Sequence, residues 1–254
     1  MADGPESTMS GPVTVICALQ AERQSWARAL RGTRAAAGDR AAAGTRTGNI
    51  VLRVCGIGQQ AARDSAIAAL RDGACTIISW GVAGGLEPSL RPGTVLLPTT
   101  VLRAGGTRLP TDAALRDRLA RALAPHVAIE AGELLSVDDV LATPRAKADA
   151  RLTGAVAVDM ESAAIGAVAV RAGRPFAVLR VVLDGARDRL PAISGLVGAD
   201  GRLDAVAVAR ALVRPRQWAP FCRSARRYGT ARSVLSRCAA VLAAGTLSSG
   251  RAVP

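Results

Sequence analysis

The chain has 254 residues, half of them hydrophobic, which is enough for one substantial domain or two small ones. Its three Trp, two Phe and one Tyr are too few for an aromatic cage, and its five cysteines lack CxxC spacing, which argues against a zinc site or a disulfide framework. The formal net charge is +13, and nine arginines but no acid follow Asp204. The polar N-terminus and the lack of a long uncharged apolar run predict a cytoplasmic protein.

Apolar runs rich in β-branched residues alternate with Ala-rich stretches, a rhythm typical of α/β folds. We expect strands at residues 13–19, 49–55, 76–82, 95–102, 133–139, 155–158 and 176–183. We expect helices at residues 21–31, 59–72, 111–123 and 160–172, a short helix opened by Thr143 and Pro144, and a Gly- and Thr-rich loop at 32–48.

The domain organisation follows from where the alternation of predicted strands and helices ends. Residues 12–190 contain no linker and are expected to form one domain. The turn-rich segment 191–203 should lead into a helical, arginine-rich extension that ends at residue 243 and packs on this domain. Residues 244–254 are expected to be disordered.

Four of the charged residues in the largely apolar segment 156–188 stand out, because ionised groups are costly to bury without partners. Asp159 fits an ordinary helix cap, and Glu161 lies in the first helical turn, where the helix dipole stabilises a carboxylate. Asp184 precedes Gly185 and fits a turn, but Arg180 lies inside a strand and needs a partner or a ligand. These residues either cap and turn the chain or line one crevice at the strand ends.

Two further stretches carry weaker signals. The segment ISWGVAGGLEPSLRPG (78–93) runs from a strand into Gly81, Gly84 and Gly85, which allow a ligand to approach the backbone closely. It matches neither GxGxxG nor a Walker A loop. Glu22 follows the first strand and is either a solvated helix acid or part of the same crevice.

The motifs ICALQAE, CGIGQQAA, GVAGGL, VDMES and LRVVLDGARD together resemble the nucleoside phosphorylase and nucleosidase superfamily. The resemblance implies a three-layer α/β/α fold with a mixed central sheet, a homo-oligomer, and cleavage of the N-glycosidic bond of a purine nucleoside. SWGVAGGLEPSLRPG, VLATPRAK, VAVDMESAA and GADGRLD resemble the hopanoid-associated phosphorylases more closely, which implies adenosylhopane as a lipid-linked substrate.

The resemblance also implies roles for individual residues. Glu161 would bind the ribose hydroxyls, with Met160 packed against the sugar. Asp184 would be the general acid that protonates N7 of adenine, which needs a pKa raised by burial.

The nucleophile side of the implied site involves three further residues. Arg180 and the backbone near Gly84 would face the nucleophile, which is phosphate as co-substrate or, in the hydrolytic branch, water activated by Glu22. No cofactor or metal is implied.

Two positions depart from the hydrolytic nucleosidases. Val82 stands where those enzymes have a serine, which favours phosphate as the nucleophile. Val140 stands where they place an aromatic residue that stacks on adenine, so the base must be held by backbone and aliphatic contacts.

The basic C-terminal segment allows two other interpretations. The segment RPRQWAPFCRSARRYGTARSVLSR interleaves three aromatic residues with seven arginines, which suits an anionic membrane surface as well as a helix packed with a solvated arginine face. A peripheral location at the inner membrane face is therefore an expectation. A nucleic-acid-binding module is the remote alternative, because no specific nucleic-acid motif accompanies the arginines.

Overall fold

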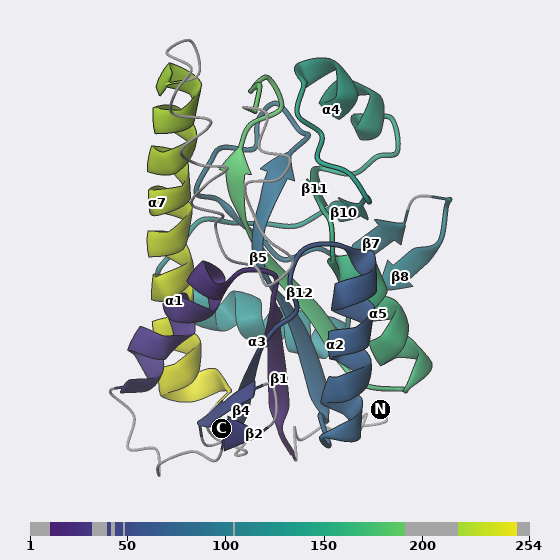
Figure 1. Cartoon of the computed structure of the whole chain (residues 1–254), viewed down its shortest axis with the longest axis vertical. Coiled ribbons are helices and arrows are strands. Elements are labelled where there is room, and N and C mark those ends of the chain that lie inside the picture. The colour runs from purple at the N-terminus through teal and green to yellow at the C-terminus, as the bar shows by residue number, and fades with distance from the viewer. Residues whose placement is uncertain are drawn as a thin grey trace, which may run out of the picture.

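The computed structural model describes residues 11–31, 40–41, 44–47, 49–103, 105–190 and 218–247. Its twelve described strands join in one mixed sheet with the order β2-β3-β4-β1-β5-β11-β10-β7-β8, and β5 also pairs with β12, which leads to β6 and β9 (Figure 1). The strands are β1 (Val13–Cys17), β2 (Arg40–Ala41), β3 (Gly44–Thr47), β4 (Ile50–Val54), β5 (Thr76–Gly85), β6 (Val95–Leu96), β7 (Thr100–Arg103), β8 (Arg108–Pro110), β9 (Ile129–Glu130), β10 (Glu133–Ser136), β11 (Ala157–Asp159) and β12 (Phe176–Asp184).

Helices cover both faces of this sheet (Figure 1). One apolar core joins the sheet to α1, α3, α7 and η2, and a second joins it to α2 and α5. The helices are α1 (Gln20–Arg31), α2 (Gln59–Arg71), α3 (Ala113–Leu123), α4 (Pro144–Arg151), α5 (Ser162–Arg171), α7 (Trp218–Val241) and η2 (Leu242–Thr246). The predicted three-layer α/β/α class with a mixed sheet is confirmed.

Three local expectations were wrong. Residues 40–41 and 44–47, expected in a loop, form β2 and β3, because β3 pairs antiparallel with β4. The single strand expected at 95–102 is divided into β6 and β7, since Pro98 between them has no N–H for a sheet hydrogen bond. Residues 244–247 are ordered, because η2 reaches Thr246 and Leu247 is fully buried in the core.

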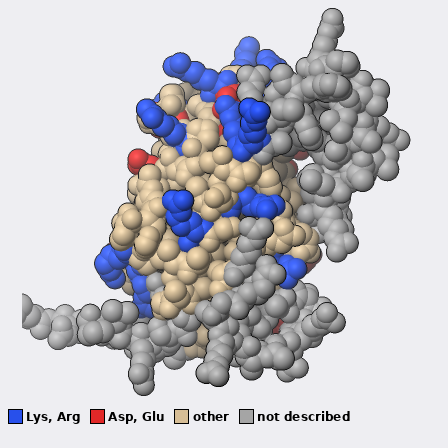
Figure 2. All heavy atoms as spheres, turned by 90° about the vertical axis from the view of Figure 1, so that its left-hand side faces the viewer, with Lys and Arg blue, Asp and Glu red and all other residues tan. Residues whose placement is uncertain are grey.

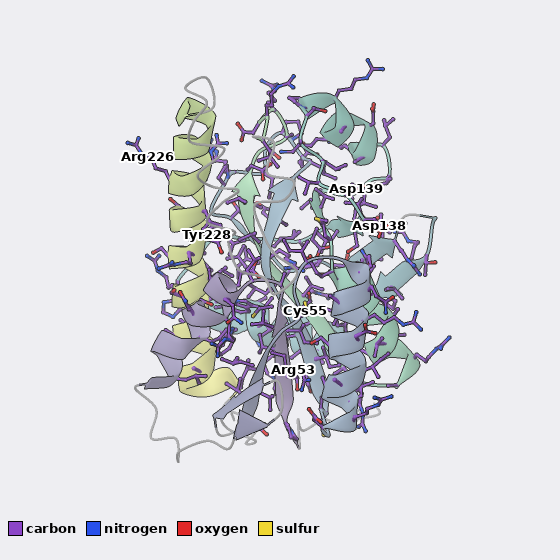
Figure 3. All side chains as sticks on the ribbon, viewed as in Figure 1. Arg53, Cys55, Asp138, Asp139, Arg226 and Tyr228 are labelled. Atoms are coloured by element: carbon purple, nitrogen blue, oxygen red, sulfur yellow. The ribbon has the colours of Figure 1, made fainter. Side chains whose placement is uncertain are left out.

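The long helix α7 packs against α1 and β12. Its inward face contributes Ala231, Leu235 and Cys238 to the core. Arg226 is exposed, whereas the hydroxyl of Tyr228 is buried, so Tyr228 does not join an outward aromatic face (Figure 3).

The connector at 191–203 and the helical segment expected at 204–217 lie outside the described residues. Among the described helices, none is long and apolar enough to cross a membrane.

Candidate active site

Three strands bring charged side chains to one region of the molecule, beside the glycines of β5. β1 leads into the turn before Glu22, β11 ends at Asp159, and β12 carries Arg180 and ends at Asp184. β12 runs parallel to β5, with Arg180 opposite Gly81 and Asp184 opposite Gly84. The site therefore gathers where β1, β5 and β12 approach their carboxyl ends, the usual ligand position in α/β sheets.

Arg180 is the centre of the first charge cluster. Its Nη2 lies 2.5 Å from Asp159 Oδ2 and 3.5 Å from Glu161 Oε2. It also donates to the hydroxyls of Ser79 and Ser162, each at 3.1 Å. Burial alone would lower the pKa of Arg180, but the neighbouring carboxylates raise it above its usual value. Arg180 is therefore a fixed cation.

The two acids beside Arg180 differ in their surroundings. The N-cap residue of α5 is Glu161 rather than Asp159, but Asp159 accepts from the backbone N–H of Ser162, the first residue of the helix, at 3.1 Å and binds Arg180 as well. Glu161 accepts from the backbone N–H of Gly58 at 3.1 Å. Burial raises the pKa of Glu161 to about 7, although Arg180 opposes the shift. Glu161 can therefore change its protonation state near neutral pH.

Glu22 is a buried acid on the other side of this cluster. Its Oε2 accepts from the backbone N–H groups of Ala18 and Leu19, both at 3.0 Å, and its Oε1 accepts from that of Val82 at 3.1 Å. Burial raises the pKa of Glu22 above its usual value, while Arg180 acts against the shift. Glu22 is therefore held rigidly and is poised to accept a proton.

Gly81 separates the two charged groups that face each other here. A Cβ at this position would overlap both Arg180 Nη1 and Glu22 Oε1, and would have to displace them. Only glycine allows the guanidinium and the carboxylate to approach β5 this closely.

Asp184 belongs to a second charge cluster with Lys147 on α4. Lys147 Nζ donates to Asp184 Oδ2 and, at 2.8 Å, to the carbonyl of Gly185. The side chains of Lys147 and Asp184 are 1% and 3% exposed. Burial raises the pKa of Asp184 above its usual value, and Lys147 opposes this effect. Gly84 lies against the same carboxylate, where it leaves room that a larger residue would fill.

The turn after Asp184 is fixed from a third element. Asp188 accepts from the backbone N–H of Gly185 at 2.7 Å, and Arg227 on α7 pairs with Asp188 at 2.7 Å. Between Val182 and Asp184 the register of β12 against β5 shifts by one residue, a β-bulge of the kind that re-aims side chains next to functional sites.

The other predicted residues lie around these clusters. Val82 contributes its backbone N–H to Glu22, while its side chain packs against the core. Met160 is half-buried between Asp159 and Glu161, and Val140 is 46% exposed in the loop after β10. Val140 thus stands as an apolar side chain open to solvent.

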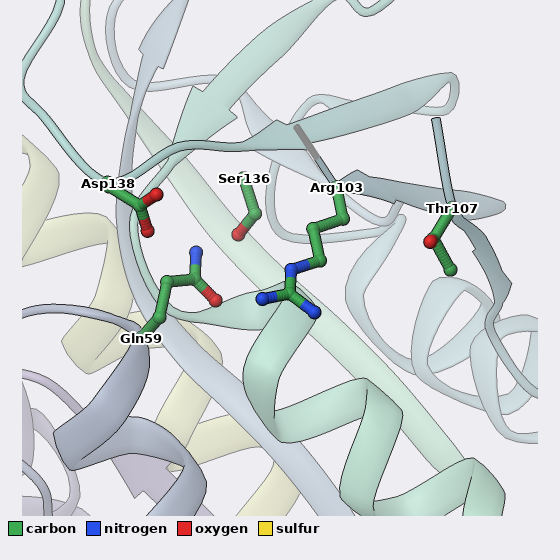
Figure 4. A pocket seen from close by; sticks show the side chains of 5 residues that line it. All are labelled: Gln59, Arg103, Thr107, Ser136 and Asp138. Carbon is green, nitrogen blue, oxygen red and sulfur yellow. The ribbon is translucent and has the colours of Figure 1, made fainter. Parts of the chain in front are cut away.

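A polar recess adjoins Asp159. It has a volume of about 140 Å³ and is lined by Gln59, Arg103, Thr107, Ser136 and Asp138 (Figure 4). Ser136 donates to Asp159, and the amide oxygen of Gln59 is buried with no hydrogen-bond partner among the described residues. The recess therefore places polar side chains, one of them with an unpaired amide oxygen, next to the Arg180 cluster.

Sequence reasoning missed Lys147, Asp188 and Arg227, along with the serines at positions 79 and 162. Lys147 alone carried a usable signal, because it is the only lysine of the chain and lies in the VLATPRAK motif. Asp188 and Arg227 look like ordinary surface charges in the sequence.

Comparisons with known proteins place this geometry in context. A family model described as phosphorylase superfamily matches residues 12–214. A 5'-methylthioadenosine/S-adenosylhomocysteine nucleosidase from Neisseria meningitidis, solved with methylthio-immucillin-A, is 21% identical with a TM-score of 0.69, covering 92% of this chain and 100% of its own. A futalosine hydrolase of Helicobacter pylori is 17% identical with a TM-score of 0.65, covering 91% and 98%. A comparison with curated proteins gave no match.

Proposed function

Because the chain belongs to the phosphorylase superfamily, and is thus an enzyme of the nucleoside phosphorylase and nucleosidase class, we propose that it releases adenine from a purine nucleoside. One observation carries the proposal: Glu22, Glu161, Arg180 and Asp184 are all buried around the ends of β5 and β12. A base, a sugar ligand, a fixed cation and an acid are the groups that cleavage of an N-glycosidic bond requires.

Glu161 and Met160 form the sugar end of the proposed site. Glu161 accepts hydrogen bonds from the ribose hydroxyls, and Met160 packs against the ring. Three carboxylates around one guanidinium make this region negative when Glu161 is ionised, with Glu22 and Asp159 as the other two. A negative surrounding stabilises the positive charge that develops on the ribose in an oxocarbenium-like transition state.

Asp184 acts at the base end. As the bond between C1′ and N9 breaks, its electron pair passes to the purine, and the proton of the Asp184 carboxyl moves to N7. A carboxyl with an ordinary pKa is almost fully ionised at neutral pH, so the raised pKa of Asp184 supports this role.

The charges favour water over phosphate as the nucleophile. Glu22 occupies the backbone N–H of Val82, which is a donor that a phosphate oxygen would need. Arg180 contacts two carboxylates and two hydroxyls, all through Nη2, and its buried Nε has no hydrogen-bond partner among the described residues, so the case against an anion rests on the surrounding carboxylates. A phosphate dianion would be repelled by these acids, whereas Glu22 can take a proton from water. We therefore place Glu22 as the general base of a hydrolase, although Val82 had favoured phosphate.

The finer substrate assignment is adenosylhopane, in hopanoid side-chain biosynthesis. Ile57 and Val140, in the loops that carry Gly58 and Asp138, are 40% and 46% exposed, and an apolar rim suits a lipid-linked nucleoside. Methylthioadenosine and adenosylhomocysteine are the alternative, from the name of the Neisseria protein.

The test is to incubate the purified protein with an adenosylhopane analogue or methylthioadenosine, with and without phosphate, and to identify the products. Adenine and free ribosyl product at a rate independent of phosphate are expected. A ribose 1-phosphate product would overturn the assignment of water, and nucleic-acid binding without adenine release would overturn the proposed adenine release. Glu22→Gln should abolish hydrolysis without unfolding the protein.

Attachment to an anionic membrane is a further part of this proposal. The α7 side of the molecule displays arginines with few acids between them (Figure 2), and Arg226 and Arg237 are both exposed. Each engaged arginine contributes about 1 kcal/mol near an anionic surface. Replacing both arginines by glutamine should weaken co-sedimentation with anionic vesicles at low salt, and unchanged binding would exclude this surface.

We also propose a homo-oligomer, which a solution mass measurement tests.

A further inference from the structure

Lys147 is an unusual residue in this chain. It is the only lysine among 33 basic residues, and it is 1% exposed. It lies on α4, which begins at Pro144 with Thr143 as its cap. A buried cation needs partners, and a chain that otherwise uses arginine has a lysine at the one place where the cation is enclosed beside Asp184.

The contacts of Lys147 leave one side of the Asp184 carboxyl open. Lys147 Nζ donates to Oδ2 and to the carbonyl of Gly185, which fixes the carboxyl relative to the following turn. Among the described residues, no hydrogen bond reaches Oδ1 of Asp184. Oδ1 is therefore the oxygen that can carry a proton toward a ligand.

We propose that Lys147 is a positioning residue that holds Oδ2 of Asp184 so that Oδ1 faces the purine. This inference rests on the proposed function, because it takes Asp184 as the general acid. The ammonium group of Lys147 is compact, so one nitrogen can donate to both the Asp184 carboxylate and the Gly185 carbonyl. An arginine at this position would be longer and planar, and its guanidinium could not place a single nitrogen in the same way.

Lys147 also affects when Asp184 holds its proton. Burial and Asp188 raise the pKa of Asp184, whereas Lys147 and Arg227 lower it, and Lys147 has the largest effect of these charged groups. A general acid works only while protonated, so activity is lost as the pH rises through its pKa. Replacing Lys147 by an apolar residue removes an opposing charge, raises the pKa of Asp184, and moves the alkaline limb of kcat to higher pH.

The kinetic test compares Lys147→Met and Lys147→Arg with Arg145→Met, an exposed position on the same helix. For Lys147→Met we expect kcat to fall about tenfold with little change in KM, and the alkaline limb to move up by about one pH unit. Lys147→Arg should keep the limb near its wild-type position while kcat falls. If the alkaline limb of the kcat profile lies at the same pH in Lys147→Met as in Arg145→Met and the wild type, the inference is wrong.

A second measurement does not depend on activity. Lysine labelled with carbon-13 at the ε position gives a single side-chain signal in this protein, because the chain has one lysine. The signal should shift in Asp184→Asn and stay in place in Asp139→Asn, which alters an exposed acid. An identical signal in both variants would exclude the contact. If the wild type cleaves no nucleoside, the proposed function fails, and this spectrum still decides whether Lys147 holds Asp184.

Discussion

The two buried charge clusters of this molecule are built in different ways. The cluster around Arg180 has three carboxylates for one cation, and its members come from the neighbouring strands β5, β11 and β12 and from the starts of α1 and α5. The cluster around Asp184 has one buried carboxylate for one buried cation, and its partners come from the outer helices α4 and α7. The first arrangement suits stabilising positive charge, and the second suits holding one acid in a single orientation.

Breaking the first cluster should have the largest effect. Arg180→Met leaves Asp159 and Glu161 buried without their cation, which should cost about 3–5 kcal/mol of unfolding free energy. Denaturant unfolding at pH 8 measures this loss. The matched change Arg174→Met removes an exposed arginine and should alter stability by less than about 0.5 kcal/mol. Equal unfolding free energies of the two variants would show that Arg180 does not stabilise this cluster.

The sequence allowed the first cluster to be predicted far better than the second. Glu161, Arg180 and Glu22 each follow or interrupt an apolar strand, and strand ends that share a sheet edge meet in space. Lys147 and Arg227 lie on helices whose docking depends on tertiary packing, which no local pattern encodes. The strands β2 and β3 were missed for the same reason, because their pairing with β4 overrides a loop-like composition.

The second cluster is tested most directly at Asp184. Asp184→Asn is nearly isosteric and should keep the fold, but it cannot deliver a proton, so kcat should fall about 100-fold or more. Adenine release by purified protein measures the effect. Asp139→Asn changes an exposed acid in the loop after β10 and should retain wild-type activity. Wild-type release by Asp184→Asn would remove Asp184 from the mechanism.

Gly81 tests how tightly the first cluster is packed. Gly81→Ala forces Arg180 and Glu22 apart, which should cost about 1–3 kcal/mol in thermal or denaturant unfolding. Gly229→Ala is the control, because a Cβ there would meet nothing within 4 Å. It lies in α7, where alanine is the better helix former, so that variant should be as stable as wild type or more so. If Gly81→Ala is as stable as the wild type, the side chains of Arg180 and Glu22 are not closely packed against β5.

The raised pKa of Glu161 predicts a pH dependence of stability. A folded-state pKa of about 7, against 4.5 as the usual value, means that the folded protein binds this proton more tightly than the unfolded chain. The resulting stability is fully present below pH 4.5 and is lost as the pH rises to about 7. Glu161→Gln removes this titration, so its unfolding free energy should decline less than that of wild type between pH 5 and pH 8. Glu130→Gln, at an exposed acid, should follow the wild-type curve, and a Glu161→Gln curve parallel to both would contradict the assignment.

The smallest effect is expected where the second cluster reaches α7. Arg227 holds Asp188 with two hydrogen-bonded contacts, at 2.7 and 3.0 Å, and Asp188 in turn accepts from Gly185 next to the acid. The pair is about one-third exposed, so Arg227→Gln should cost no more than about 1 kcal/mol of stability. A turn that is less well held should nevertheless lower kcat about three- to tenfold, because proton transfer is sensitive to small displacements. Arg227→Lys keeps the charge but loses the planar guanidinium, so its kcat should lie between those of the wild type and Arg227→Gln. Arg226→Gln removes the same charge from the exposed neighbouring position, and if its kcat equals that of Arg227→Gln, α7 does not support the acid.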